Sequence, residues 1–276
     1  MGLRGQKESN HAFPSHDLAS RRLAGQFVSS KPPAFFLAGD STTAPQSSTG
    51  GGWGYGFLNQ TLTRGAFGIN FAVNGSTTVS FVDEGHWAKV IAAVEQYKWK
   101  YEPIVTIQFG HNDQKPGANI SMPQFIANIE RLAADAVQAG AIPIVVTSLT
   151  RRVFKTSTSP ELVERNLLDV VVGAKTAAER GHYHLIDLNQ MSTDYCNSIG
   201  TVASHKYNLD PADTTHLNDK GSIVFGAMVA ELLRWAIPWL GQYVAPDQDL
   251  IVALREGAFF LPVSAEGKVT NNTDAA

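Results

Sequence analysis

A short triplet, Gly39-Asp40-Ser41, stands directly after an apolar run of strand type at residues 34–37. A serine just past the carboxyl end of a parallel strand would lie in the crevice where α/β proteins bind their ligands. Its hydroxyl could act as a nucleophile, and its backbone N–H could donate one hydrogen bond to an oxyanion. Because such triplets also occur in ordinary turns, this interpretation depends on what the rest of the chain supplies.

Three further groups of polar residues follow along the chain. Asn74-Gly75 and Gly110-His111-Asn112-Asp113 each follow an apolar run, and Asp213 stands three residues before His216. The carboxyl ends of parallel strands lie at one edge of a sheet, so we expect these groups to converge on Ser41. Together they supply a base, a carboxylate and hydrogen-bond donors, which serine-dependent cleavage of an ester or amide requires.

The chemistry of each side chain suggests a role. His216 is the candidate base because imidazole titrates near neutral pH, and Asp213 is close enough to orient it. The backbone N–H groups of Ser41 and Gly75 and the side-chain amide of Asn112 are the candidate oxyanion donors. We therefore predict a catalytic set of Ser41, Asp213 and His216, with an oxyanion hole formed by Ser41, Gly75 and Asn112.

Several other residues are candidates for contact with a substrate, each with a structural alternative: Asp40, Trp53, His111, Arg151 and Arg152. Trp53 follows a glycine-rich loop and could stack on a sugar ring or pack in the core. His111 could line an acyl pocket, although a structural role in its turn is favoured. One of the two arginines could grip a substrate carboxylate while the other has a structural role.

Other motifs indicate no metal or cofactor. His182 and His184 flank Tyr183, but no third ligand lies nearby in sequence, so we predict no metal site. Cys196 is the single cysteine, which excludes an intramolecular disulfide and indicates a small buried side chain. The run Gly50-Gly51-Gly52 lacks the Lys-Ser/Thr of a phosphate loop, and we expect no cofactor.

The elements that must position these residues alternate between short apolar strands and amphipathic helices. This pattern predicts an α/β fold, a three-layer α/β/α sandwich around a five-stranded parallel sheet. The predicted strands are 34–37, 69–73, 103–109, 141–149 and 184–188, and the predicted helices are 53–62, 86–99, 122–139, 160–180 and 218–240 with Asn218 as N-cap. Residues 250–254 and 259–263 look β-like.

Length and composition indicate one large domain. The chain has 276 residues, of which 43% are hydrophobic, and its net charge of −3 gives no sign of a nucleic-acid or membrane surface. We predict a flexible arm at 1–32, a hydrolase domain at 33–243 and a C-terminal extension at 244–276, and we expect a monomer. The first 30 residues lack the apolar core of a secretory signal.

The polar groups match, in order, the conserved blocks of the SGNH (GDSL-type) hydrolases. Longer matches resemble the rhamnogalacturonan acetylesterase branch: Gly39-Asp40-Ser41-Thr42, Asn70-x-Ala72-x-x-Gly75, Asp83-Glu84-Gly85-x-Trp87, Gln108 to Lys115, and Arg151-Arg152-x-Phe154. The resemblance covers about residues 34–240. It implies a flavodoxin-like fold, the catalytic roles assigned above, no metal, and deacetylation of a pectin through an acetyl-serine intermediate. The resemblance also implies a secreted protein. Because residues 1–30 lack the apolar core of a secretory signal, we leave the location of the protein open.

The expected function is that of a serine esterase that removes O-acetyl groups from a carbohydrate, with pectic rhamnogalacturonan as the leading substrate. One alternative keeps the catalytic residues but changes the substrate to an acyl ester of a small metabolite or a lipid. A more distant alternative is a sugar-binding protein that has the fold without the activity. Chromogenic esters of different acyl length would separate the first two, and oligosaccharide binding without hydrolysis would favour the third.

Overall fold

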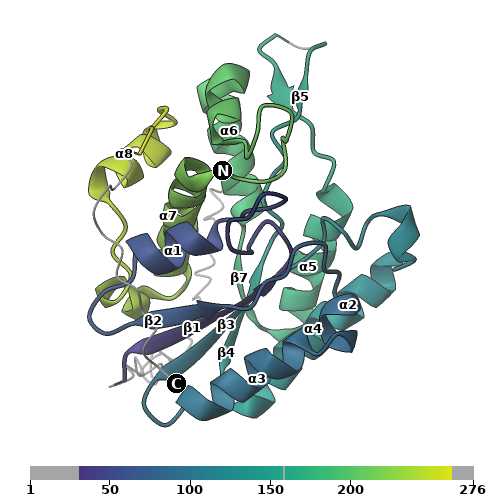
Figure 1. Cartoon of the computed structure of the whole chain (residues 1–276), viewed down its shortest axis with the longest axis vertical. Coiled ribbons are helices and arrows are strands. Elements are labelled where there is room, and N and C mark those ends of the chain that lie inside the picture. The colour runs from purple at the N-terminus through teal and green to yellow at the C-terminus, as the bar shows by residue number, and fades with distance from the viewer. Residues whose placement is uncertain (1–30, 158, 263–276) are drawn as a thin grey trace, which may run out of the picture. The chain divides into compact units, whose positions relative to one another are not determined.

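The central sheet consists of five parallel strands in the order β2-β1-β3-β4-β7. The computed structural model describes residues 31–157 and 159–262 (Figure 1). The strands are β1 (Pro33–Gly39), β2 (Phe67–Asn70), β3 (Glu102–Gln108), β4 (Ile142–Val146) and β7 (His184–Ile186). With the five strands numbered along the sheet's own chain order, this is the 2-1-3-4-5 order of flavodoxin-like folds, as the sequence predicts.

Helices cover both faces of the sheet, which explains why its strands are apolar on both sides. One face is covered mainly by α3 (His86–Tyr97), α4 (Met122–Ala139) and α5 (Leu168–Gly181). The other is covered mainly by α1 (Gly54–Gln60), α6 (Leu188–Ser204) and α7 (Asp219–Ala236), with α8 (Gln248–Glu256) outside them (Figure 1). Short elements complete the fold: α2 (Ser80–Asp83), β5 (Phe154–Lys155), β6 (Leu162–Val163) and the 3₁₀ turns Pro116–Ala118, His205–Tyr207 and Pro238–Gln242.

The residues of β1 show how the two cores are divided. Phe35 and Leu37 belong to the cluster with α7, whereas Ala34, Phe36 and Ala38 belong to the cluster with α3 and α4. This alternation follows from the two-residue period of a strand, and every residue of β1 is buried. A central strand buried on both faces fixes the position of the turn that follows it.

Three expectations about the elements are wrong. The predicted helix at 160–180 begins only at Leu168, because the chain first forms the β5–β6 hairpin, in which Phe154 pairs with Val163. The β-like segment at 250–254 is the middle of helix α8. No strand forms at 259–262, and residue 263 lies outside the described residues.

Two helices, α6 and α8, were not predicted from the sequence pattern, although both begin at a capping aspartate. In α8, Asp247 accepts a hydrogen bond from the Leu250 N–H, and Gly257 ends the helix in the left-handed region, so the segment is capped at both ends. Helix α6 follows Asp187, whose side chain accepts from the Gln190 N–H, but its polar sequence hides the apolar face. Asn218 caps α7 as predicted, by accepting from the Gly221 N–H.

The ends of the chain are described only in part. The predicted arm at 1–32 lies outside the described residues except for its last two. The described part of the predicted extension, residues 244–262, contains α8, whose Leu250, Ile251 and Leu254 join the core cluster of α7. Among the residues that the structure describes, no helix is both long and apolar enough to cross a membrane.

Candidate active site

Ser41 lies in a tight turn immediately after the central strand β1. The carbonyl oxygen of Asp40 accepts hydrogen bonds from the N–H groups of Thr43 and Ala44, both at 3.0 Å. The Asp40 carboxylate accepts from the N–H of Thr42 at 2.9 Å and from its hydroxyl at 2.8 Å. Gly39 pairs with Gln108 across the sheet, and a side chain at Gly39 would collide with Thr43 and with the Gln108 carbonyl. The turn therefore needs glycine before the Asp-Ser pair.

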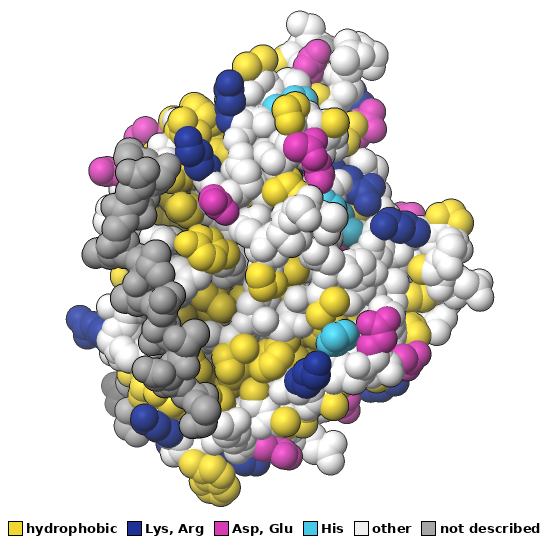
Figure 2. Space-filling model, in the orientation of Figure 1, with side chains coloured by type: hydrophobic (Ala, Val, Ile, Leu, Met, Phe, Trp, Pro, Cys, Tyr) yellow, Lys and Arg dark blue, Asp and Glu magenta, His cyan; other side chains and the backbone are white. Residues whose placement is uncertain are grey.

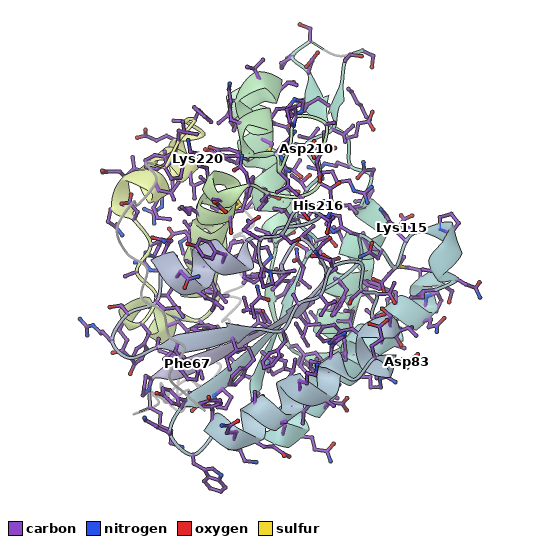
Figure 3. All side chains as sticks on the ribbon, in the orientation of Figure 1. Phe67, Asp83, Lys115, Asp210, His216 and Lys220 are labelled. Atoms are coloured by element: carbon purple, nitrogen blue, oxygen red, sulfur yellow. The ribbon has the colours of Figure 1, made fainter. Side chains whose placement is uncertain are left out.

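A continuous chain of hydrogen bonds joins Asp213, His216 and Ser41. The Oγ atom of Ser41 lies 2.8 Å from His216 Nε2, and His216 Nδ1 lies 2.7 Å from Asp213 Oδ2. The other oxygen of Asp213 accepts from the N–H groups of Thr215 and His216, both at 2.9 Å. The loop thus holds the carboxylate and the imidazole in one fixed arrangement; Figure 3 labels His216. A hydroxyl, an imidazole and a carboxylate in this order can generate an alkoxide nucleophile.

The electrostatics of Asp213 suit this arrangement. Partial burial acts to raise its pKa, but the hydrogen bonds from His216 and Thr215 outweigh that effect and leave the pKa below its ordinary value. The carboxylate is therefore ionised near neutral pH. An ionised Asp213 stabilises an imidazolium on His216, which is the species formed when the imidazole takes the proton of Ser41.

The two backbone N–H groups that are predicted as oxyanion donors have no acceptor within the described residues. Within the described residues, the N–H groups of Ser41 and Gly75 donate no hydrogen bond. Gly75 adopts a φ of 81°, in the left-handed region that favours glycine. The amide of Asn112 donates to the Ser76 carbonyl at 2.9 Å, which uses one of its two N–H bonds and leaves the other available. These groups could bind an oxyanion.

Lys115 fixes the orientation of the Asn112 amide. Its Nζ donates to Asn112 Oδ1 at 2.7 Å. This bond identifies Oδ1 as the acceptor and leaves the NH₂ group to face Ser76 and the neighbouring space. A positive charge on the carbonyl side also polarises the amide, which strengthens the N–H groups as donors. No role for Lys115 was predicted from the sequence.

The loop that carries Gly75 is fastened to the Asn112 loop by Asp113. Its Oδ1 accepts from the Thr78 N–H at 2.8 Å and from the Thr78 hydroxyl at 2.6 Å, and Asn128 Nδ2 donates to Thr78 Oγ1 at 2.9 Å. Burial raises the pKa of Asp113, although the bonds from Thr78 act against this. The two loops that carry oxyanion donors are therefore held together.

Gln108, at the end of β3, is hydrogen-bonded to the turn that follows Ser41. Its Oε1 accepts from Trp53 Nε1 at 2.8 Å, from Thr42 Oγ1 at 3.3 Å and from Thr43 Oγ1. Trp53 is fully buried, so the idea that it stacks on a sugar ring is wrong and the alternative of core packing describes it. No role for Gln108 was predicted from the sequence, although it begins the Gln108 to Lys115 match to the acetylesterase branch.

Asp40 and His111 form a buried pair beside the nucleophile. Their nearest charged atoms, Oδ2 and Nδ1, lie 3.7 Å apart, and both residues are at most 2% exposed. Burial raises the pKa of Asp40, whereas burial and then the charge of Arg151 lower that of His111 to about 3. Burial therefore disfavours the charged form of each side chain. This burial contradicts direct substrate contact by Asp40.

Arg151 and Arg152 have different surroundings. Arg152 is fully buried, and it donates from Nε to Asn208 Oδ1 and from Nη2 to the His216 carbonyl, both at 2.6 Å. It is the structural arginine of the pair, and a substrate contact is excluded by its burial. Arg151 is half-buried on the same edge. Figure 2 shows Lys and Arg side chains beside a histidine on this face of the molecule.

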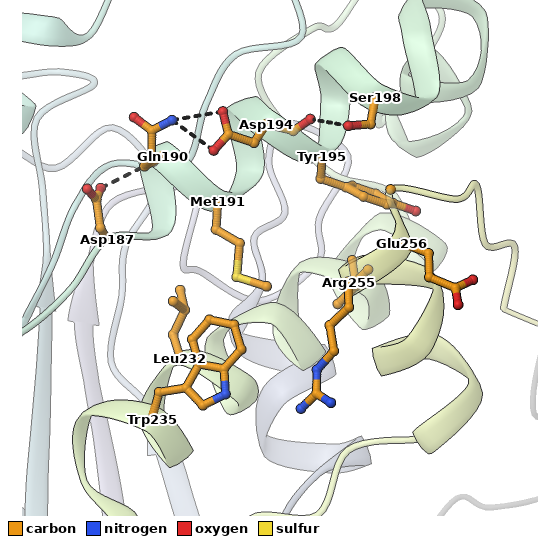
Figure 4. A pocket seen from close by; sticks show the side chains of 12 residues that line it. Asp187, Gln190, Met191, Asp194, Tyr195, Ser198, Leu232, Trp235, Arg255 and Glu256 are labelled. Carbon is orange, nitrogen blue, oxygen red and sulfur yellow. Dashed lines mark hydrogen bonds between the residues drawn. The ribbon is translucent and has the colours of Figure 1, made fainter.

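A large cavity elsewhere in the fold does not belong to this site. It has a volume of about 460 Å³ and lies between α6, α7 and α8 (Figure 4). Its walls include Met191, Leu232, Trp235 and Arg255, and none of the predicted site residues lines it. Within the described residues no cluster of three or more His, Cys, Asp or Glu side chains could hold a metal ion.

The sequence and the fold also resemble those of known proteins. The sequence profile of the GDSL-like lipase/acylhydrolase family matches residues 37–222. The chain belongs to this family. Its class, a carboxylic ester hydrolase, is thereby confirmed.

Two curated relatives are from Bacillus subtilis (strain 168). Rhamnogalacturonan acetylesterase RhgT is 31% identical over 242 residues, which cover 82% of this chain and 97% of the relative. A probable rhamnogalacturonan acetylesterase is 27% identical over 212 residues, covering 72% of this chain and 91% of the relative. The predicted resemblance to this branch is therefore confirmed.

Solved structures share the fold. A crystal structure of a Bacillus subtilis protein has a TM-score of 0.63 at 22% identity, and the match covers 74% of this chain and 57% of that one. An acetylxylan esterase from Geobacillus stearothermophilus has a TM-score of 0.51 at 16% identity, covering 76% and 96%. These similarities confirm the predicted α/β/α architecture.

Proposed function

We propose that this chain is a serine esterase that removes O-acetyl groups from a carbohydrate. The hydrogen-bonded chain from Asp213 through His216 to Ser41 carries the proposal, because it ends on a hydroxyl whose own backbone N–H donates to no group of the described residues. The names of the two curated relatives support a carbohydrate acetate as substrate and rhamnogalacturonan as its leading candidate.

The proposed reaction has two steps, the acylation of Ser41 and its deacylation by water. His216 takes the proton of Ser41, whose Oγ attacks the acetyl carbonyl, and the negative oxygen accepts hydrogen bonds from Ser41 N–H, Gly75 N–H and Asn112. The sugar alcohol leaves with the proton from His216, and the acetyl group stays on Ser41. Water, activated by the same imidazole, then attacks the acetyl-serine and releases acetate.

The experiment compares acetate release from acetylated rhamnogalacturonan with hydrolysis of 4-nitrophenyl acetate. Wild type should act on both, and Ser41→Ala should lose both activities by about 10³-fold or more. Ser198→Ala is a matched control, because Ser198 lies on α6 and, within the described residues, its hydroxyl donates only to the Asp194 carbonyl. Undiminished hydrolysis by Ser41→Ala would contradict the assignment of the nucleophile.

A longer chromogenic ester tests the substrate alternative. If 4-nitrophenyl octanoate is hydrolysed faster than the acetate and no acetylated polysaccharide is cleaved, the substrate is a metabolite or lipid ester instead. Binding of oligosaccharides by a protein that hydrolyses none of these esters would favour the sugar-binding alternative.

A further inference from the structure

A half-exposed tryptophan, Trp235, lines the cavity between α6, α7 and α8 (Figure 4). The residue is 56% exposed, and within the described residues its indole makes no hydrogen bond and no aromatic contact. Met191 and Leu232 line the same cavity and pack partly against the core. Trp235 therefore offers a flat apolar surface that the described part of the fold does not cover, and its indole N–H is available as a donor.

The walls of this cavity are held together by bonds between its elements. Arg255 on α8 donates from Nε to Glu231 on α7 at 3.0 Å, and Arg234 donates to the other oxygen of Glu231 at 3.2 Å. Glu231 is buried, so both bonds are shielded from water. On α6, the Tyr195 hydroxyl donates to the Ala258 carbonyl, just after α8, at 3.2 Å. The cavity of about 460 Å³ is thus preformed, and its volume is in the range of ligand sites.

Polar side chains on α6 and α8 supply hydrogen-bonding capacity to the same cavity. Each carboxylate oxygen of Asp194 accepts from Gln190 Nε2 at 2.8 Å, and within the described residues no cation pairs with this carboxylate. Glu231 engages only Nε and Nη2 of Arg255, which leaves the N–H bonds of Nη1 unused among those residues. The cavity therefore has acceptors with spare lone pairs and a donor with spare N–H bonds.

The lining of the cavity argues against several other uses. It contains no histidine and no cysteine, and the Ser198 hydroxyl is bonded to the Asp194 carbonyl within α6, so nothing in it resembles the arrangement around Ser41. Exposed charges on its walls oppose the burial of a long acyl chain. Within the described residues no cluster of side chains could hold a metal ion. A ligand with an apolar face and a polar edge fits these walls best.

We propose that this cavity is a second carbohydrate-binding site, which holds a sugar unit of the polymeric substrate outside the catalytic site. A pyranose ring has C–H groups on its faces and hydroxyls at its edge, so it can lie on Trp235 while its hydroxyls bond Asp194 and Arg255. The choice of a sugar as ligand rests on the proposed function. None of the predicted site residues lines the cavity, so a polymer bound there is kept near Ser41 at a high effective concentration.

Affinity electrophoresis in gels that contain deacetylated rhamnogalacturonan tests this site without turnover. The polysaccharide should retard the wild-type protein, and Trp235→Ala should raise the apparent Kd about 5–30-fold. Trp235→Phe keeps a smaller ring and should retain part of the affinity. Trp99→Ala is the matched control, because Trp99 is 80% exposed but does not line the cavity. Equal mobility of wild type and Trp235→Ala in these gels would overturn the proposal.

Kinetics separate this proposal from the proposed function. Trp235→Ala should raise KM for acetylated rhamnogalacturonan about 5–30-fold with kcat unchanged, and it should leave both constants for 4-nitrophenyl acetate as in wild type. Weaker polysaccharide binding by Trp235→Ala, in a protein that deacetylates no carbohydrate, would contradict the proposed function alone. A lower kcat for the small ester in Trp235→Ala would mean that Trp235 supports the fold, and it would contradict a separate binding site.

Discussion

The Nη2 atom of Arg152 donates a 2.6 Å hydrogen bond to the backbone carbonyl of His216. This bond holds the backbone of His216, whose imidazole ring contacts Ser41. The guanidinium is fully buried, and burial lowers its pKa to about 10, so it remains charged at neutral pH. Arg152 thus positions the imidazole without touching the reacting atoms.

Replacing Arg152 by Gln should damage both stability and catalysis. The variant leaves Asn208 Oδ1 without its donor and the His216 carbonyl with only the Leu209 N–H, which should cost about 2–4 kcal/mol of unfolding free energy. A less well-held His216 should lower kcat for 4-nitrophenyl acetate about tenfold with a smaller change in KM. Urea denaturation and steady-state kinetics measure the two effects. A variant that is merely less stable, with an unchanged kcat, would contradict the positioning role.

Gln108 and Trp53 should be energetically coupled. Gln108→Leu leaves the Trp53 indole N–H and the Thr43 hydroxyl without an acceptor, whereas the Thr42 hydroxyl keeps Asp40, so we expect a loss of about 2–4 kcal/mol. Trp53→Phe removes one of these donors and some packing, and it should cost about 1–3 kcal/mol. Since they share one hydrogen bond, the double variant should be less destabilised than the sum, by about 1 kcal/mol. Additive losses in a double-mutant cycle would show that the bond contributes nothing.

Asn112 and Lys115 allow the oxyanion donor to be tested in two steps. Asn112→Ala should lower kcat by about 10²–10³-fold, the usual loss for one donor of this kind. Lys115→Met keeps the amide but removes the bond that orients it, so kcat should fall by a smaller factor, about 3–10-fold. Both losses should appear for 4-nitrophenyl acetate. A higher KM with an unchanged kcat in Lys115→Met would mean that Lys115 acts on substrate binding rather than through Asn112.

Much of the fold could be predicted because its strands carry strong local signals. Residues 34–38 form a continuous apolar run and 103–107 one that is interrupted only by Thr106, and both end at polar turns, as expected for strands buried on both faces. The meeting of Ser41 with His216, 175 residues apart, followed from one general rule about parallel sheets. The burial of Trp53 could not be predicted, since its partner Gln108 lies 55 residues away.

Two helices, α6 and α8, could not be predicted because their sequences lack a clear helical pattern of apolar residues. Helix α6 is polar along most of its length, and its buried positions include Ser192 and Thr193, which give no apolar stripe. In α8 the run Leu250–Leu254 reads as a strand because five residues are too few to separate a helical from a β period. Its caps, Asp247 and Gly257, are the features that would have decided the case.

His111 should impose a pH dependence on stability. Its pKa in the folded protein is about 3, against 6.5 as the ordinary value. Between these values the unfolded chain binds the proton and the folded protein does not, so the unfolding free energy rises with pH. The contribution is roughly 1.4 kcal/mol per pH unit over most of that window. Asp40 and Asp113, with raised pKa values, act in the opposite direction above pH 3.8.

The variant His111→Gln isolates this contribution, because Asp40, Asp113 and Asp213 remain in both proteins. Relative to the variant, wild type should lose unfolding free energy steadily as the pH falls from about 6.5 toward 3, and the difference between the two should be constant above pH 7. Urea denaturation at pH 4, 5, 6 and 7.5 measures it. Parallel pH curves for the two proteins would mean that His111 is protonated as easily in the folded state as in the unfolded chain, which its burial beside Arg151 argues against.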